Sequence, residues 1–302
     1  MENQQLTYRV GPHAFCICNH SSADITELLP SFRDFQIDRM SEKEEPVFNV
    51  HLHGESFVEE TNTATPLQEV SFEWEDAQCT IRQLTKDAHL VSITPHSGEE
   101  TFFMESTRNF RDNLVHLPQC EPATAHFVLN NFLMMLYAFT AVYRCTLLMH
   151  ASVVVKDNAG YLFLGKSGTG KSTHTSLWLK HIEGSHLLND DNPVVHMECM
   201  NDKITVYGSP WSGKTPCYRN ESFPVGAFVR LEQAPANEIK KEKTVRAFAS
   251  LVPSCSCLKQ NKEMYTKMVQ VVTCLASHTQ TFHLKCLPNE EAAQLAWRTI
   301  HQ

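Results

Sequence analysis

Residues 165–173 have the sequence GKSGTGKST, which matches the pattern G-x-x-x-x-G-K-[ST] of a phosphate-binding loop. The chain has only 11 glycines among 302 residues, and three of them lie in this loop. In such a loop, successive backbone N–H groups and the N-terminus of the following helix converge on an anion. The sequence therefore predicts that the chain binds a nucleoside triphosphate, with ATP and Mg²⁺ as the expected cofactors.

The surroundings of the loop support this interpretation. Residues 160–164 predict a short apolar strand before the loop, and residues 173–180 predict a helix after it. Lys171 is expected to reach the β- and γ-phosphates, and the Ser172 hydroxyl is expected to bind Mg²⁺. A glycine turn that caps a helix by chance is the alternative. The residues expected to hold the nucleotide are Gly165, Ser167, Gly168, Thr169, Gly170, Lys171, Ser172 and Thr173.

Two adjacent acids, Asp190 and Asp191, follow 19 residues after Lys171. That separation is enough for one helix and a return strand beside the strand of the loop, so the acids would face the phosphates. One carboxylate can hold Mg²⁺, and the other can act as a base toward an attacking hydroxyl. A polar turn before Asn192 is the alternative, and the phosphate loop upstream favours the functional interpretation.

The segment from residue 150 to residue 195 resembles HPr kinase/phosphorylase and, more distantly, the phosphoenolpyruvate carboxykinases. The resemblance rests on Met149-His150-Ala151, on the phosphate loop, and on the sequence LNDD at 188–191. It implies that Asp190 is the acid/base residue, that Asp191 is the metal ligand beside Ser172, and that His150 lies near the reacting phosphate. A buried structural histidine is the alternative for His150.

The chain departs from that family after the paired acids, because no signature for binding HPr is evident. Residues 207–220 are instead rich in turn formers, with Lys214 and Arg219 as cations and Trp211 and Tyr218 as flat surfaces. We hypothesise that this loop closes over the site and brings Arg219, or alternatively Lys214, onto the γ-phosphate or the acceptor. A solvated surface loop is the alternative.

The first part of the chain carries no catalytic motif. Apolar and polar residues alternate at 47–53 and 70–75, which predicts antiparallel strands with one buried face. We therefore expect an α/β protein, α+β overall. A β-rich domain of unknown role would occupy 1–120, and a P-loop domain of the HPr-kinase/carboxykinase type would occupy 121–302.

The second half of the chain also contains patterns for elements beyond the acids. The sequence predicts a hairpin at 197–208 around Asn201-Asp202, helices near 236–251 and 261–277, a strand at 280–286, and a final helix at 288–300.

Composition limits the partners and the location of the protein. The net charge of −8 argues against nucleic acid as the main partner. The chain has 11 cysteines without a C-x-x-C pair and no secretory leader, which predicts reduced thiols and a cytoplasmic location. His51 and His53 could meet a metal from one strand face, but solvated or packed histidines are the favoured interpretation because no third ligand lies nearby.

The segment at 122–143 contains no Asp, Glu, Lys or Arg and is long enough to span a bilayer. It also contains His126, Asn130 and Asn131, which are costly in lipid. We therefore predict a helix buried in the fold, and no membrane partner.

These patterns together predict an ATP- and Mg²⁺-dependent kinase that phosphorylates a hydroxyl on a protein serine or a small molecule. A carboxykinase-like enzyme and a nucleotide-sensing module without catalysis are the alternatives. The sequence does not identify the acceptor, and it leaves the oligomeric state open, a homo-oligomer included.

Overall fold

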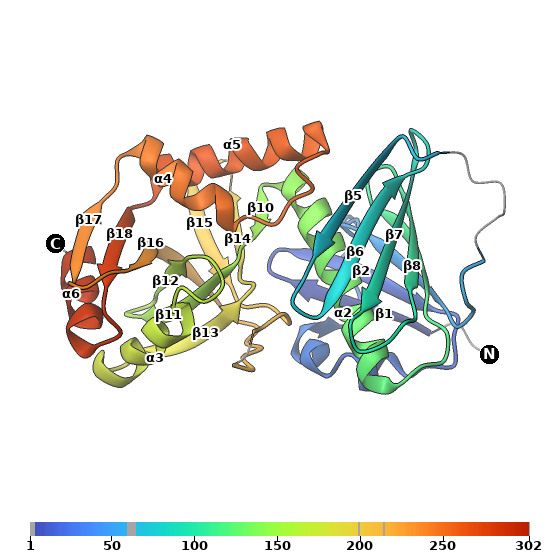
Figure 1. The fold of residues 1–302 in the computed structure, drawn as a ribbon, viewed down its shortest axis with the longest axis horizontal. Coiled ribbons are helices and arrows are strands. Elements are labelled where there is room, and N and C mark those ends of the chain that lie inside the picture. The colour runs from blue at the N-terminus through green and yellow to red at the C-terminus, as the bar shows by residue number, and fades with distance from the viewer. Residues whose placement is uncertain (1–3, 59–64, 199, 214, 302) are drawn as a thin grey trace. The chain divides into compact units, whose positions relative to one another are not determined.

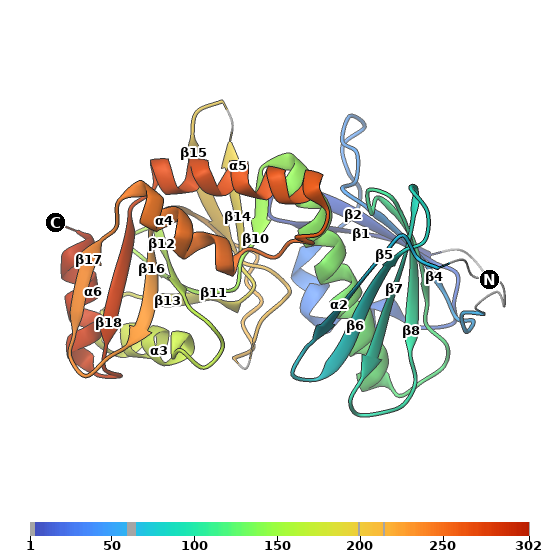
Figure 2. The ribbon, with the colours of Figure 1, turned by 45° about the horizontal axis from the view of Figure 1, so that its top comes forward.

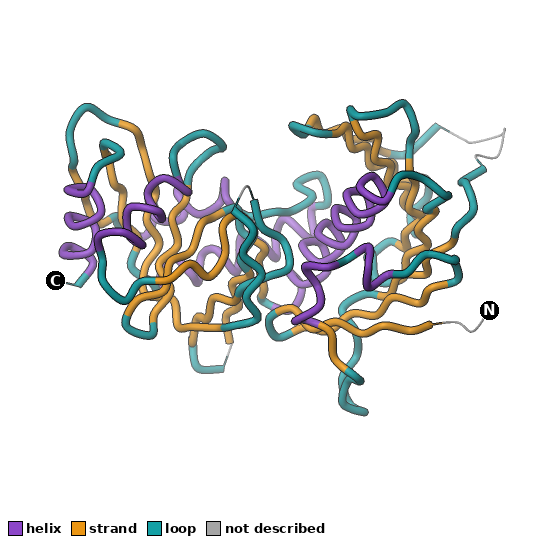
Figure 3. Tube along the Cα trace, turned by 90° about the horizontal axis from the view of Figure 1, so that it is seen from below, coloured by secondary structure: helices purple, strands orange, loops and turns teal. Residues whose placement is uncertain are grey.

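The computed structural model describes residues 4–58, 65–198, 200–213 and 215–301. The chain forms two compact units. Unit 1 contains Met1–Arg9 and His13–Thr140, and unit 2 contains Val10–Pro12 and Ala141–Gln302. Each unit is built on a large mixed sheet with few helices, so the fold is α+β (Figures 1 and 3). The apolar segment that follows residue 121 groups with unit 1 up to Thr140.

The sheet of unit 1 has the strand order β3-β1-β2-β4-β9-β8-β7-β6-β5. Strands β5 to β9 form an antiparallel meander, as the alternating pattern predicts. The expectation of a purely antiparallel region is wrong, because β4 pairs in parallel with both β2 and β9. A long connection through α1, η1 and β3 separates β2 from β4, and such a crossover permits parallel pairing. The elements are β1 (Gln4–Val10), β2 (His13–Asn19), α1 (Ile25–Leu28), η1 (Pro30–Phe35), β3 (Gln36–Ile37), β4 (Asn49–His53), β5 (Gln68–Glu73), β6 (Ala77–Gln83), β7 (Ala88–Pro95), β8 (Phe102–Thr107), β9 (Asp112–His116) and α2 (Pro122–Ala141).

Helix α2 is the long apolar helix. In the described part of the chain, Pro122–Arg144 is the one helical stretch long and apolar enough to cross a membrane, and 72% of its most apolar window is buried. The Met135 sulfur lies 3.9 Å from the Cys79 sulfur of β6, and the His126 ring bonds the Leu28 carbonyl oxygen at 2.6 Å. These contacts are those of a helix packed in the core of unit 1.

The main path of the sheet in unit 2 has the order β10-β14-β15-β16-β12-β11-β13, and β18 pairs with both β16 and β17. The elements are η2 (Val142–Arg144), β10 (Thr146–Leu148), β11 (Ala151–Lys156), β12 (Ala159–Leu164), α3 (Lys171–His181), β13 (His186–Asp191), β14 (Val194–Glu198), β15 (Lys203–Tyr207), β16 (Ser222–Gln233), β17 (Glu238–Lys241), α4 (Thr244–Leu251), η3 (Val252–Ser254), α5 (Lys262–His278), β18 (Thr281–Cys286) and α6 (Glu290–Ile300).

A tight hairpin joins β11 to β12. Asp157 and Asn158 form its turn with φ values of 49° and 59°, a left-handed conformation that short polar residues tolerate. Strand β11 is antiparallel to β12 on one side and to β13 on the other, so β12 and β13 run parallel with β11 between them. The expectation that the return strand lies beside the strand of the loop is therefore wrong, because β11 and β16 already occupy both edges of β12.

Several other predictions about unit 2 can be compared with the structure. The hairpin around Asn201-Asp202 is confirmed as β14 and β15, and the predicted helix at 261–277 is α5. The helix predicted at 236–251 is too long, because Glu238–Lys241 instead form β17 and pair with the edge of β18. The last helix begins at Glu290, after Asn289 caps it by accepting a hydrogen bond from the Ala292 N–H at 3.0 Å.

One apolar cluster holds α3 and α6 against the sheet of unit 2. Figure 2 shows α6 beside β17 and β18, and α3 packs against α6 and against strands β11, β12 and β13. Phe163, the penultimate residue of β12, makes edge-to-face contacts with His174 at 4.7 Å and with Trp178 at 5.2 Å between ring centroids. Trp178 makes a further edge-to-face contact with Trp297 of α6. This packing fixes the direction in which α3 leaves the phosphate loop.

Replacement of Phe163 by Ala should lower the free energy of unfolding by about 3–5 kcal/mol, since the side chain is fully buried and its removal leaves a cavity under α3. Urea denaturation followed by tryptophan fluorescence measures the loss. Val245→Ala is the control, because Val245 is 82% exposed and its truncation should cost little. A loss at Phe163 no larger than that at Val245 would contradict this account of the core.

Candidate functional site

The phosphate loop connects the carboxyl end of β12 to the first residue of α3. Gly168 and Gly170 have φ values of +77° and +99°, which are strained for any residue with a side chain. At Gly165 an added Cβ would lie 3.0 Å from the side chain of Thr169. The Thr169 N–H donates to the Lys166 carbonyl oxygen at 3.1 Å and closes the turn. A side chain at any of these three glycines would therefore strain the backbone or crowd a neighbouring residue of the loop.

Lys171 is the first residue of α3 and is only 8% exposed. Its ammonium group donates to His150 Nε2 at 2.8 Å and to the Gly165 carbonyl oxygen at 3.2 Å. Burial lowers the pKa of Lys171, while the nearby carboxylates of Asp191 and Asp190 act in the opposite direction. The cation is thus held inside the loop by two acceptors and lies near both predicted acids.

His150 connects Lys171 to the second acid. Its Nδ1 lies 2.8 Å from Asp191 Oδ1. An ammonium group can only donate, so His150 Nε2 is the acceptor and Nδ1 carries the proton that it shares with Asp191. His150 sits just before β11, where its backbone N–H donates to the Ser254 carbonyl oxygen at 2.6 Å. The structure therefore brings together three of the residues that the sequence analysis selected.

Asp190 is buried, at 4% exposure. Its Oδ1 accepts hydrogen bonds from the Ser152 hydroxyl at 2.5 Å and from the Ser172 hydroxyl at 3.0 Å. Its Oδ2 is buried with no hydrogen-bond partner among the described residues. Ser172 is thus bonded to Asp190 and not to Asp191. The division of the acids into one base and one metal ligand remains a prediction.

Two residues of this network were not selected from the sequence. Ser152 pairs with Asp190 across β11 and β13, a neighbour relation that only the sheet register reveals. Asn189 is fully buried, and its Oδ1 accepts the backbone N–H groups of Asp191 at 3.0 Å and Asn192 at 2.9 Å. An Asn directly before paired acids is a typical former of such a turn, which is the signal that could have identified it.

The segment after Gly208 is anchored along β13. The Asn189 side chain donates to the Trp211 carbonyl oxygen at 3.0 Å, and the Gly213 N–H donates to the Asp190 carbonyl oxygen at 3.1 Å. Trp211 is 2% exposed, so the expectation that it offers a flat surface is wrong, whereas Tyr218 is 37% exposed. The loop covers the backbone of the acids with its own main chain.

Arg219 lies at the other end of β13 from the paired acids. Its guanidinium group pairs with Glu221 at 3.3 Å, and Glu221 is 3.7 Å from His186, the first residue of that strand. Lys214 lies outside the described residues. A role for either cation on the γ-phosphate or the acceptor remains a prediction.

The site offers oxygen ligands for a hard cation. Among the residues that the structure describes, no group of three or more His, Cys, Asp and Glu side chains is placed to hold a metal. Mg²⁺ at a nucleotide site is normally held by one or two protein oxygens together with phosphate oxygens and water. The Ser172 hydroxyl and the neighbouring carboxylates are ligands of that kind.

Comparison with known proteins adds little to this geometry. No family model matches the chain, and no curated protein matches it. One similar solved structure is the Hpr(Ser) kinase/phosphatase from Coxiella burnetii, with a TM-score of 0.30 and 13% sequence identity. The match covers 51% of this chain and 88% of that one. A likeness this weak carries no argument about activity, so the functional conclusion rests on the site.

His174 of α3 predicts a pH dependence of stability. The side chain is buried, its Nε2 accepts the indole N–H of Trp178 at 3.1 Å, and burial lowers its pKa to about 4. The unfolded chain takes up this proton near pH 6.5, and the folded chain does so only near pH 4. The stability present above pH 6.5 is therefore lost as the pH falls toward 4, by about 3 kcal/mol at most.

Urea denaturation at a series of pH values between 7 and 4 measures this loss. His174→Gln should flatten the slope, and the matched control His186→Gln, at a half-exposed histidine, should keep the parent slope. Identical slopes in the parent and His174→Gln would show that His174 does not set the dependence.

Proposed function

We propose that unit 2 is a P-loop kinase domain of the HPr-kinase/carboxykinase type, which transfers the γ-phosphoryl group of ATP to a hydroxyl on a protein serine or a small molecule. The observation that supports this most strongly is the hydrogen-bonded chain from Lys171 through His150 to Asp191, at the N-terminus of α3. This chain joins a cation, a histidine and one of the two acids beside the loop, and the other acid, Asp190, bonds the Ser172 hydroxyl. A cytoplasmic location and the absence of nucleic-acid and membrane partners are part of the same proposal.

The phosphates would bind at the loop and the first turn of α3. Backbone N–H groups and the helix dipole stabilise anions at this position. Lys171 would exchange its contacts with His150 and the Gly165 carbonyl oxygen for the β- and γ-phosphates. The exchange is favourable because phosphate oxygens carry formal charge, and charge-assisted hydrogen bonds are the stronger kind.

Ser172 and Asp191 would hold Mg²⁺. Asp191 is the more accessible acid, with 29% of its side chain exposed, and its carboxylate is a hard oxygen ligand. When bound, the metal supplies positive charge to the phosphate oxygens.

Asp190 would act as the base. Its Oδ2 accepts no hydrogen bond from the residues that the structure describes, so this oxygen can take the proton of the acceptor hydroxyl. As that proton moves to Asp190, the acceptor oxygen bonds to the γ-phosphorus, and the bond from the γ-phosphorus to the bridging oxygen breaks. ADP then leaves with the electron pair. The hydroxyls of Ser152 and Ser172, both on Oδ1, orient the carboxylate.

Lys171→Ala should weaken ATP binding by about 2–4 kcal/mol, since it removes a desolvated cation from the phosphates. Calorimetric titration of parent and variant measures the difference. Lys180→Ala is the control, because Lys180 is an exposed lysine in the last turn of the same helix. Equal affinity of Lys171→Ala and the parent would refute the assignment of the phosphate loop.

The two acids should respond differently to neutralisation. Asp191→Asn should impair Mg²⁺-dependent nucleotide binding, because an amide is a poor ligand for a hard dication. Asp190→Asn should leave that binding nearly intact and lower turnover by roughly 10²–10⁴-fold, the usual contribution of a positioned base. Titrations with and without Mg²⁺, and phosphoryl transfer from labelled ATP, separate the two effects. Equal loss of nucleotide binding in both variants would contradict the division of roles. If neither variant changed binding or turnover, the paired acids would be only part of a polar turn.

A further inference from the structure

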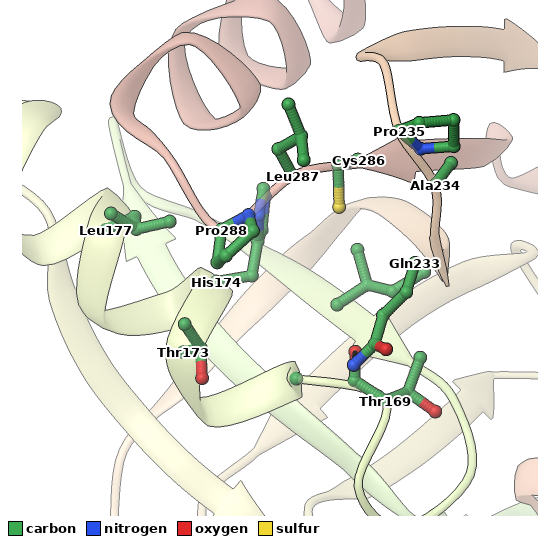
Figure 4. Close-up of a pocket in the computed structure, with 12 residues that line it drawn as sticks. Thr169, Thr173, His174, Leu177, Gln233, Ala234, Pro235, Cys286, Leu287 and Pro288 are labelled. Atoms are coloured by element: carbon green, nitrogen blue, oxygen red, sulfur yellow. Dashed lines mark hydrogen bonds between the residues drawn. The ribbon is translucent and has the colours of Figure 1, made fainter.

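A pocket of about 500 Å³ opens beside the phosphate loop (Figure 4). One wall is formed by Thr169 and Gly170 of the loop together with the first turns of α3. The opposite wall is formed by the end of β16 and the two residues after it, and by the end of β18 and the two residues after it; its members are Leu231, Gln233, Ala234, Pro235, Cys286, Leu287 and Pro288. The pocket lies wholly in unit 2, and its position adjoins the loop without including the paired acids.

The strand order places this pocket and the acids on opposite sides of the loop. Strands β16 and β18 run parallel to β12, so their carboxyl ends lie at the same edge of the sheet as the loop. Strands β11 and β13, which carry the acids and their partners, lie on the other side of β12. On α3, Ser172 bonds Asp190, whereas Thr173, His174 and Leu177 line the pocket. A ligand with its reacting end at Asp190 would extend its far end into this pocket.

The lining suits a mostly apolar group with a few polar edges. Leu177, Leu231, Leu287 and Pro288 form apolar walls. Gln233 is a polar member of the lining, and its Nε2 donates to the carbonyl oxygens of Gly168 at 3.2 Å and Thr169 at 3.4 Å. The end of β16 is therefore tied directly to the loop.

His174 lines the pocket, and its hydrogen bond with Trp178 defines the tautomer of its ring. The indole N–H of Trp178 is a donor only, so the His174 Nε2 that accepts it is unprotonated. The neutral ring therefore carries its proton on Nδ1. A ring nitrogen with a lone pair, as in a purine, is the matching acceptor.

We propose that this pocket binds the base of a purine nucleotide whose phosphates lie in the 165–172 loop. The proposal rests on the proposed function, because it needs the loop to bind a triphosphate. It adds the position of the base and the residues that select it. The apolar walls of α3, β16 and β18 enclose the ring, and His174 Nδ1 donates to it.

The test compares ATP with inorganic tripolyphosphate, which has the phosphates but no base. Ala234→Phe fills the pocket from the partly buried Ala234, and the matched control Ala236→Phe adds the same ring two residues away at an exposed alanine outside the lining. Ala234→Phe should weaken ATP binding roughly tenfold or more, because the base would lose its contact with the apolar walls. Binding of tripolyphosphate should not change. Ala236→Phe should change neither.

The outcomes separate the two claims. If the parent binds neither ligand, the phosphate-loop assignment fails and the base site fails with it. If the parent binds both ligands but Ala234→Phe weakens both equally, or weakens neither, the loop assignment stands and the base site is refuted. Retained tripolyphosphate binding also shows that the variant is folded.

A second measurement uses the unaltered protein. Cys286 lines the pocket, and Figure 4 shows its sulfur directed toward the space between Pro288 and Gln233. Burial raises the pKa of its thiol, so alkylation is best followed over hours at alkaline pH by peptide mass spectrometry. ATP should slow the alkylation of Cys286 and tripolyphosphate should not. Equal protection by both ligands, or by neither, would contradict the assignment.

Discussion

The position of β11 between β12 and β13 determines where the candidate site of unit 2 lies. Because β11 is antiparallel to both neighbours, its amino end meets the carboxyl ends of β12 and β13. His150 and Ser152 therefore stand between the phosphate loop and the paired acids, and each bonds to one of them. A return strand directly beside β12 would have no such residues between loop and acids. The tight turn at Asp157 and Asn158 makes this insertion possible.

The same arrangement explains how the fold tolerates a buried lysine. Desolvation of an ammonium group is costly unless it is paired and hydrogen-bonded. Lys171 meets this demand with a histidine whose proton is shared with Asp191 and with a carbonyl oxygen of its own loop. These acceptors are weaker partners than phosphate oxygens, so in the proposed function Lys171 would leave them for a bound phosphate.

Much of the site could be predicted from the sequence because it is local. The loop, the helix after it and the strand that ends in two acids are encoded within one continuous stretch, where glycine positions and apolar runs are informative. Residues and strands that become neighbours only through the pairing of distant strands could not be predicted. Ser152 can be recognised as a site residue only when the strand pairing places it opposite Asp190. Residues 238–241 form β17, and not the first turn of a helix, because they pair with the edge of β18. Parallel pairing of β4 with β2 and β9 in unit 1 was missed for the same reason, since pairing between distant segments leaves no local pattern.

The most direct test of the central claim is a crystal structure of the protein with Mg²⁺ and a non-hydrolysable ATP analogue. We predict β- and γ-phosphates in the 165–172 loop, with the Lys171 ammonium moved from His150 Nε2 to the phosphate oxygens. We also predict that the γ-phosphate points toward Asp190. A nucleotide bound elsewhere, or a Lys171 still bonded to His150 with the analogue present, would contradict it.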